Sequence, residues 1–398
     1  MVFNEKELIQ LCKHMINIKS YSGEENNLVE FLKEKMIELG YDEVSVDEYG
    51  NIIGKINGKG SGKTVLFDGH VDTVPVQDES LWIHKPFKAE IEDGKIYGRG
   101  ASDMKGALAS MIFSLASLKK NNILLDGDVY VSGTVHEECF EGVALGKVID
   151  RVKPDYVVIG EASDLKLKVG QKGRAEISIT TKGKSAHSSN PEVGINAVYK
   201  MMDIVRGVKE LTPSEHPSLG KGIIELTDIK SNPYPGASVV PENCTATYDR
   251  RLLVGETKDT VIDEIKNVID ELFVKDDKLS AKVEIALGEN VCYTGKVIKA
   301  LRFFPAWLMD IESNIVKSSL EGMRKAGIPM ETSTYYFCTN GSCSAGERNI
   351  PTIGFGPSLE RLAHVVDEYI EIDQLVKSCN GYMNIALELS KQEITFSK

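Results

Sequence analysis

The chain has 398 residues, of which 42% are hydrophobic and 27% are charged, as in ordinary globular proteins of two or three domains. Its 47 basic and 59 acidic residues give a net charge of −12. The chain also lacks a block of basic residues. Its negative charge therefore argues against nucleic acid and anionic membranes as partners. No apolar run approaches the roughly 18 residues that a membrane span needs.

The cysteines and the N-terminus point to a compartment. Seven cysteines form an odd set without a Cys-x-x-Cys pair, which predicts reduced thiols rather than a disulfide or zinc-ribbon framework. The first residues carry acids followed by an amphipathic pattern, unlike a signal peptide. We therefore expect a cytoplasmic protein.

Much of the chain alternates between helical patterns and short apolar runs. Apolar spacing predicts helices at 5–19, 24–39, 104–120 and 373–391. The runs predict buried strands at 64–68, 128–135, 156–160 and 352–356. This alternation predicts an α/β domain on a mixed, mostly parallel sheet flanked by helices.

The pattern changes between residues 174 and 293. Strands that alternate apolar and polar residues are expected near 174–181, 223–229, 244–253 and 281–287, with helices at 193–211 and 257–273. Half-exposed strands with helices of this kind predict a separate α+β domain. We expect residues 174–293 to be inserted into a catalytic domain formed by 1–173 and 294–398.

The predicted strands of the α/β domain lead into side chains that bind metal ions. In an open parallel sheet, ligands bind at the carboxyl ends of the strands. The side chains expected there lie in 68–72, which contains His70, in 136–138, at Glu161 and near His364, and Asp103 joins them at the start of the helix 104–120. A single acid at such a place is usually a turn residue or a helix cap, but five such groups would repel one another unless cations neutralised them. Two imidazoles and three carboxylates suit a dinuclear site for Zn²⁺, Mn²⁺ or Co²⁺.

Several segments, in order along nearly the whole chain, resemble the metallopeptidase M20 family. They are 67–75, 97–106, 137–138, 160–161, 183–187 and His364. That family includes acetylornithine deacetylase, succinyl-diaminopimelate desuccinylase, aminoacylase and a glutamate-releasing carboxypeptidase. Segments 239–244, 249–257 and 339–357 look most similar to a branch called selenium-metabolism-linked hydrolases, a label that reports gene neighbourhood rather than chemistry.

The resemblance assigns roles to the residues of the metal site. It implies two divalent ions, Zn²⁺ before Co²⁺ or Mn²⁺. One would be held by His70, Asp103 and Glu161, the other by Asp103, Glu138 and His364, with Asp103 bridging. It also implies a cis peptide bond between Asp103 and Met104. Asp72 would orient the His70 imidazole, and Glu137 would be the general base.

The resemblance also implies roles outside the metal site. His187, in the inserted domain, would stabilise the oxyanion in the site of a partner subunit, which implies a homodimer formed through that domain. Arg251 would bind a substrate carboxylate, helped by backbone donors at Gly341 and Ser342. Two positions depart from the family pattern: His136 stands where Asp is frequent, and Ser238 where Asn is frequent.

The sequence therefore predicts a dinuclear metal-dependent amidohydrolase that acts on a small carboxylate-bearing substrate, first of all an N-acyl amino acid. A dipeptidase or carboxypeptidase is the alternative within the hydrolases, because the metal chemistry would be the same. A non-catalytic binding protein with the same fold is a more remote alternative.

Overall fold

A computed structural model describes residues 3–392, and its chain divides into two compact units. The first comprises Met1–Gln171, Glu289–Lys299 and Trp307–Lys398, and the second Lys172–Gly288 and Ala300–Ala306. The short segment 300–306, placed in the catalytic domain by the sequence analysis, belongs to the second unit. Residues 393–398 of the predicted catalytic domain lie outside the described part.

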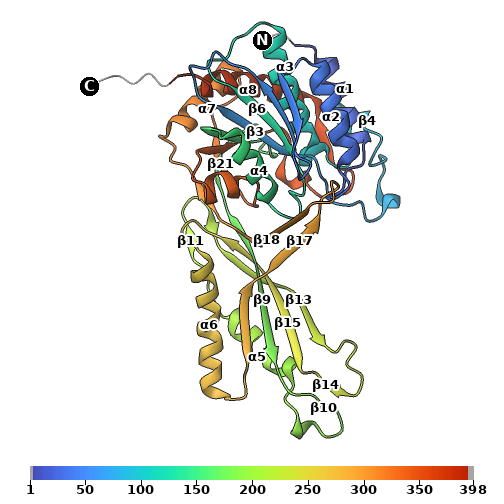
Figure 1. Cartoon of the computed structure of the whole chain (residues 1–398), viewed down its shortest axis with the longest axis vertical. Helices are drawn as coiled ribbons and strands as arrows, with labels where there is room; N and C mark the ends of the chain where they lie inside the picture. Colours follow the sequence, from blue (N-terminus) through green and yellow to red (C-terminus); the bar gives the residue numbers. More distant parts are fainter. Residues whose placement is uncertain (1–2, 393–398) are drawn as a thin grey trace, which may run out of the picture. The chain divides into compact units, whose positions relative to one another are not determined.

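The first unit is built on a nine-stranded mixed sheet (Figure 1). Its strands are, in order, β1 (Glu43–Val46), β2 (Ile52–Ile56), β6 (Val129–Thr134), β3 (Val65–His70), β7 (Tyr156–Ile159), β22 (Thr352–Gly354), β8 (Leu167–Gln171) and β20 (Trp307–Leu308), with β21 (Thr332–Tyr335) beside β8. The central strands β6, β3, β7 and β22 are parallel, and antiparallel pairs flank them. Strand β3 is buried at every position, as its continuous apolar run predicts.

Helices cover both faces of this sheet. They are α1 (Glu5–Asn17), α2 (Asn26–Glu38), α3 (Gly106–Lys120), α4 (Val143–Val152), α7 (Asn314–Lys325) and α8 (Ile372–Leu389). Leu145 and Val148 of α4 pack on Leu66 of β3. The next strand residue, Phe67, faces the other way and meets Tyr382 of α8 edge-on. Successive strand side chains alternate between faces, so one strand serves both helical layers.

Shorter elements connect these layers. They are the 3₁₀ turns η1 (Glu79–Leu81) and η5 (Glu360–Leu362), the wide turns η2 (Ala101–Lys105) and η4 (Ser342–Glu347), and a small sheet of β4 (Glu90–Glu92), β5 (Lys95–Tyr97) and β23 (Tyr369–Glu371). Turn η2 contains a cis peptide bond between Asp103 and Met104, as the family resemblance implies.

The second unit is an antiparallel sheet with two helices. The sheet contains β13 (Ile223–Asn232), β15 (Asn243–Leu252), β9 (Gly173–Lys182), β16 (Ala281–Ile285) and β19 (Phe303–Phe304), and the helices are α5 (Ala197–Lys209) and α6 (Lys258–Lys275). Burial alternates along β9, with Ala175, Ile177 and Ile179 packed in the core beneath the helices. The shorter elements of this unit are β10 (Ala186–His187), η3 (Pro191–Val193), β11 (Glu215–His216), β12 (Gly220–Lys221) and β14 (Val239–Val240). Strands β17 (Leu287–Val291) and β18 (Val297–Leu301) pair with each other in the part of the chain where the second unit gives way to the first and back again.

The predicted fold class is confirmed: a mixed sheet with parallel central strands lies between helices, and a smaller α+β unit accompanies it. None of the helices among residues 3–392 combines the length and apolar character needed to cross a membrane. The seven cysteines, all within the described part, are free thiols.

Candidate metal centre

The five predicted ligands come from the carboxyl ends of neighbouring strands and from two turns. His70 is the last residue of β3, and Glu161 follows β7 by two residues. Glu138 lies in the turn after β6. Because β6, β3 and β7 are adjacent and parallel, these ends lie at one edge of the sheet. Turn η2 supplies Asp103, and the loop after η5 supplies His364.

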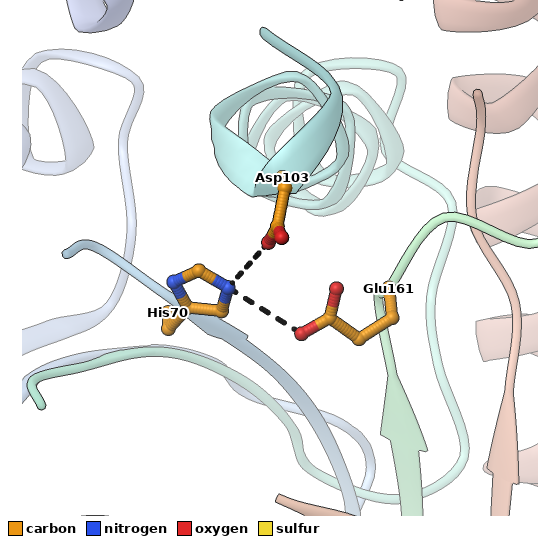
Figure 2. A group of neighbouring side chains, drawn as sticks. All are labelled: His70, Asp103 and Glu161. Carbon is orange, nitrogen blue, oxygen red and sulfur yellow. Dashed lines mark hydrogen bonds and ion pairs between the residues drawn. The ribbon is translucent and has the colours of Figure 1, made fainter. Parts of the chain in front are cut away.

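Three of these residues form the first ligand group (Figure 2). Nε2 of His70 lies 2.9 Å from Oδ1 of Asp103 and 3.4 Å from Oε1 of Glu161. One ligand atom from each residue lies within 4.8 Å of the other two. His70 and Glu161 are buried, and Asp103 is partly exposed. This is the set that the sequence analysis assigned to one ion.

The second ligand group shares Asp103 with the first. Nε2 of His364 lies 2.9 Å from Oε2 of Glu138 and 3.2 Å from Oδ2 of Asp103. These ligand atoms also lie within 4.8 Å of one another. Asp103 therefore presents one carboxylate oxygen to each group, which is the geometry expected of a bridging ligand.

The donor set fits metal ions. Nδ1 of His70 lies 2.8 Å from the backbone carbonyl of Asp72, and because a carbonyl only accepts, Nδ1 carries the proton. Nε2 of a neutral His70 then presents its lone pair to two carboxylates, an arrangement that a shared cation stabilises. Oε1 of Glu138 is buried and accepts no hydrogen bond from any residue between 3 and 392. Each group offers an imidazole nitrogen and two carboxylates, a set that suits a divalent ion that binds both nitrogen and oxygen ligands.

The electrostatics of the cluster lead to the same conclusion. Burial and the charge of Asp103 raise the pKa of Glu138 to about 7. Burial alone would lower the pKa of His70, but hydrogen bonds to Asp103, Asp72 and Glu161 outweigh it and raise that pKa well above its ordinary value. The ligands therefore hold protons against burial and mutual repulsion, and divalent cations would take over this role.

Glu137 lies beside the ligands without being one of them. It is 7% exposed, and its Oε1 accepts no hydrogen bond within the described part of the chain. Burial raises the pKa of Glu137 well above its usual range, His70 opposes the shift, and Glu161 and Glu138 add to it. Glu137 is therefore a buried carboxyl group beside two ligand groups, and its role as general base stays a prediction.

Asp72 contacts both His70 and the turn after β6. Its backbone carbonyl accepts from His70 at 2.8 Å, whereas its carboxylate is 3.6 Å from the same nitrogen. The carboxylate also accepts from the backbone N–H groups of Glu137 (3.0 Å) and Glu138 (3.2 Å) and from the Ser22 hydroxyl (2.7 Å). Asp72 thus holds both the ligand ring and the turn that presents Glu137 and Glu138.

Sequence reasoning did not identify four residues that support this centre: Ser22, Glu25, Arg99 and Glu368. Glu25 accepts from the backbone N–H of His136, whose φ is 56°. Arg99 and Glu368 form a buried ion pair against the turn that carries Asp103. For Glu368, its place four residues after His364 was an available signal. The other three had none, because the groups they bind near the centre lie far away in the sequence: the Asp72 carboxylate for Ser22, the His136 N–H for Glu25 and the Glu368 carboxylate for Arg99.

His187 lies in the second unit, on the two-residue strand β10. Its side chain is exposed, and Nδ1 accepts from the Ser189 backbone N–H at 3.2 Å. Since Nδ1 is an acceptor, the proton of the neutral ring is on Nε2. His187 therefore presents an N–H donor, as stabilisation of an oxyanion requires.

The three predicted substrate-binding residues differ in how much of their hydrogen-bonding capacity is used. Nε of Arg251 pairs with Asp249 at 2.9 Å, and its side chain is 31% exposed. The backbone N–H of Gly341 donates to Oγ1 of Thr339, and that of Ser342 donates to the Thr339 carbonyl. Both donors are thus engaged within their own loop, and their role toward substrate stays a prediction.

Comparison with known proteins identifies the family. The model of peptidase family M20/M25/M40 matches residues 66–388. The chain belongs to this family. As a member of this family, the protein is a hydrolase of amide or peptide bonds. Membership also favours an enzyme over the non-catalytic binding protein considered above.

Individual M20 relatives extend over nearly the whole chain. YgeY of Escherichia coli (strain K12), an uncharacterized protein, is 32% identical over 390 residues, covering 96% of this chain and 94% of its own. A probable succinyl-diaminopimelate desuccinylase of Staphylococcus epidermidis is 28% identical, covering 96% and 98%. The solved structure of Bacillus subtilis YXEP, a dinuclear metal-binding peptidase of the M20 family, superposes with a TM-score of 0.71 at 14% identity, covering 97% and 98%. At that identity the last match shows the fold alone.

Proposed function

We propose that this M20 hydrolase is a dinuclear metal-dependent deacylase of N-acyl amino acids. The observation that carries the proposal is the pair of ligand groups that share Asp103, with Glu137 beside them, whose buried Oε1 accepts no hydrogen bond from the described residues. The dinuclear metal centre of YXEP and the desuccinylase assignment of the staphylococcal relative support it.

The ions proposed are two Zn²⁺, with Co²⁺ or Mn²⁺ as substitutes. His70, Asp103 and Glu161 would hold one, and Asp103, Glu138 and His364 the other. Such ions supply Lewis-acid activation of water and of the amide carbonyl. The absence of any cysteine ligand and the three carboxylates agree with ions of this hardness.

The chain's own residues would handle the protons and the developing charge. Glu137, buried and without a hydrogen bond at Oε1 from residues 3–392, would take a proton from the attacking water and pass it to the leaving nitrogen. The Asp72 carboxylate, through the backbone N–H groups of Glu137 and Glu138, keeps base and ligand in fixed positions. His187 would donate from Nε2 to the oxyanion.

The substrate class follows from Arg251. Its guanidinium is held by Asp249, which also accepts from Arg174 at 2.6 Å, so the planar group is pre-oriented for a carboxylate. A substrate with a free carboxylate near the scissile amide meets this requirement. An N-acyl amino acid and a dipeptide both qualify, so an M20-type dipeptidase or carboxypeptidase is the second candidate. Ser238, which stands where Asn is frequent in the family, would affect recognition of the same carboxylate-bearing end of the substrate.

The experiment combines metal analysis with a substrate panel. Protein loaded with Zn²⁺, Mn²⁺ or Co²⁺ is assayed on N-acetyl and N-succinyl amino acids and on dipeptides, and bound metal is counted by elemental analysis. We expect two ions per chain and kcat/KM values that favour the N-acyl amino acids. Preference for dipeptides would establish the alternative. A fully loaded protein inactive on every amide would contradict the function.

We further propose that the enzyme is a homodimer formed through the second unit, with His187 serving the neighbouring site. Strand β13 supports this, because it is an edge strand of ten residues with exposed Ile223 and Ile229. Unpaired strand edges readily pair with another chain, and two-fold dimers are the commonest oligomers. A cytoplasmic location, as the cysteine pattern predicts, belongs to the same proposal.

A further inference from the structure

A buried carboxylate, Glu368, holds the turn that carries the shared ligand Asp103. The Glu368 residue is 0% exposed. Its Oε1 accepts from the backbone N–H groups of Ser102 (2.8 Å) and Asp103 (3.0 Å). Its Oε2 accepts from the backbone N–H of Gly100 at 3.1 Å and from Nη1 of Arg99 at 2.5 Å. Of the four backbone N–H groups from Gly100 to Asp103, all but that of Ala101 thus donate to one side chain.

Turn η2 depends on this acceptor because its backbone is irregular. Gly100 has a φ of 84°, and Asp103, with φ −125° and ψ 93°, lies outside the helical region. Buried N–H groups without regular partners need acceptors from elsewhere. Because one of the N–H groups that Glu368 binds is that of Asp103 itself, the direction in which the Asp103 carboxylate leaves the chain depends on Glu368.

The same ion pair reaches the segment that carries His364. While Nη1 of Arg99 holds Glu368, its Nη2 donates to the backbone carbonyl of His364 at 3.4 Å. His364 has a φ of 65°, in the left-handed region that residues other than glycine seldom adopt. Its backbone therefore requires contacts of this kind. Arg99 is itself buried, with its guanidinium over the Trp82 ring.

The two ligand groups depend on this support unequally. In the second group, both Asp103 and His364 have backbones tied to the Arg99–Glu368 pair. In the first group only Asp103 does, because His70 is fixed at the end of β3 and Glu161 follows β7. A change in the pair should therefore alter the second group more than the first.

We propose that Glu368 is a positioning residue of the dinuclear centre: with Arg99 it fixes Asp103 relative to His364 and thereby sets the affinity of the ion that these residues share with Glu138. This inference rests on the proposed function, since it concerns the second of two ions. It assigns Glu368 no contact with substrate or ion.

The test is a metal titration of Glu368→Gln. A Gln amide keeps the volume but offers N–H donors where one carboxylate oxygen accepts, so Arg99 or a backbone N–H of the turn loses its acceptor. We expect the second ion to bind about 10–100-fold more weakly, the usual effect of removing an outer support of a metal site, and the first ion to bind nearly as in wild type. With Co²⁺, the magnetic coupling between two bridged ions should disappear from the EPR spectrum at limiting metal.

Two further variants make the test decisive. Asp47→Asn is the matched control, because Oδ1 of Asp47 also accepts three backbone N–H groups, those of Tyr49, Gly50 and Asn51, but none carries a ligand. It should bind both ions normally. Arg99→Lys leaves the backbone bonds of Glu368 in place and removes the contact with His364, so it should weaken the second ion even if Glu368→Gln does not fold.

Folded Glu368→Gln or Arg99→Lys protein that binds both ions as wild type does would overturn the inference, and so would equal weakening of both ions. If wild-type protein binds fewer than two ions, the proposed function falls together with the inference. If wild type binds two and the variants are unchanged, only the role of Glu368 is wrong.

Discussion

At the scale of single residues, the adjacent carboxylates of Glu137 and Glu138 lie in different environments. Glu138 lies 2.9 Å from His364, whereas Glu137 has a buried oxygen that accepts no hydrogen bond among residues 3–392. The turn held by Asp72 makes this possible, since neighbouring side chains of a regular strand would point to opposite faces. The two positions should therefore respond differently to the same substitution.

Glu137→Gln should keep both ions and lose activity by about 10²–10⁴-fold, the usual contribution of a general base. Glu138→Gln, the matched variant one residue on, should instead lose metal because it removes a ligand. Elemental analysis and kcat measured on the same preparations distinguish the two effects. Loss of metal from Glu137→Gln, or activity near that of wild type, would contradict its assignment as the base.

Metal binding should also depend on pH through His364. Hydrogen bonds to Asp103 and Glu138 raise the pKa of His364 to about 10 in the ion-free protein, although burial opposes them. An ion must then displace a proton from His364 at any pH below about 10, so apparent affinity should rise as pH increases from 6 to 9. Competition with a chelator of known affinity measures this. Affinity independent of pH after correction for the chelator would contradict it.

The same shift has the opposite effect on the stability of the ion-free protein. A histidine whose pKa is raised on folding stabilises the folded state fully below the unfolded pKa of about 6.5. This contribution is lost as pH rises through the folded value of about 10. Rising pH should therefore lower the free energy of unfolding of the ion-free protein while it increases the affinity for the ion.

At the scale of elements, strands β7 and β22 approach closely where Glu161 leaves the sheet. Gly356, just beyond β22, exchanges hydrogen bonds with the Ser163 hydroxyl, and a Cβ at 356 would collide with the carbonyl oxygens of Gly160 and Glu161. These obstacles are backbone atoms, so they cannot move aside as a flexible side chain would. The close approach therefore helps to fix the position of a ligand.

Gly356→Ala should destabilise the protein by about 1–3 kcal/mol through overpacking and displace Glu161. Thermal melting and metal titration measure the two effects, and the first ion should be weakened more than the second. Gly236→Ala is the control, because a Cβ there meets only ordinary contacts at 3.6 Å or more. Unchanged melting and metal affinity for Gly356→Ala would show that the strands can move apart freely.

At the scale of the whole molecule, ion binding should contribute to stability. The ligands come from five separate segments, so the ions would crosslink β3, β6, β7, turn η2 and the loop of His364. An ion present at 100 times its Kd stabilises the folded state by about 2.7 kcal/mol. Exhaustive chelation should abolish activity and lower Tm, and Zn²⁺, Mn²⁺ or Co²⁺ should restore both. Full activity in protein shown to be free of metal would contradict the dinuclear mechanism.

The proposed sharing of active sites is tested by mixing inactive subunits. Glu137→Gln and His187→Ala chains, once exchanged, should form about half mixed dimers with one intact site each, restoring about a quarter of wild-type activity. Subunit exchange is verified by mass. Exchange without recovery of activity would place His187 in the site of its own chain.

The sequence alone determined the fold class and the residue types of the metal centre. Apolar runs mark buried parallel strands because both of their faces are covered, and acids or histidines just after such runs must meet at one edge of the sheet. Metal chemistry restricts ligands to a few side chains, and the family resemblance then selected His70, Asp103, Glu138, Glu161 and His364 among the candidates that follow the strands. Their division between two ions came from the family resemblance rather than from spacing.

Only the tertiary structure showed how these ligands are held. Besides its contacts with His70, Asp72 accepts from the backbone of the turn that carries Glu137 and Glu138, and Glu368 accepts from the backbone of Ser102 and Asp103 in turn η2. The loop of Gly341 and Ser342 uses its own donors. The side chains of Asp72 and Glu368 bind backbone N–H groups far along the chain, which places no requirement on the identity of the residues they contact, so the sequence offered no signal beyond the place of Glu368 four residues after His364. Such contacts are decided when distant segments pack together.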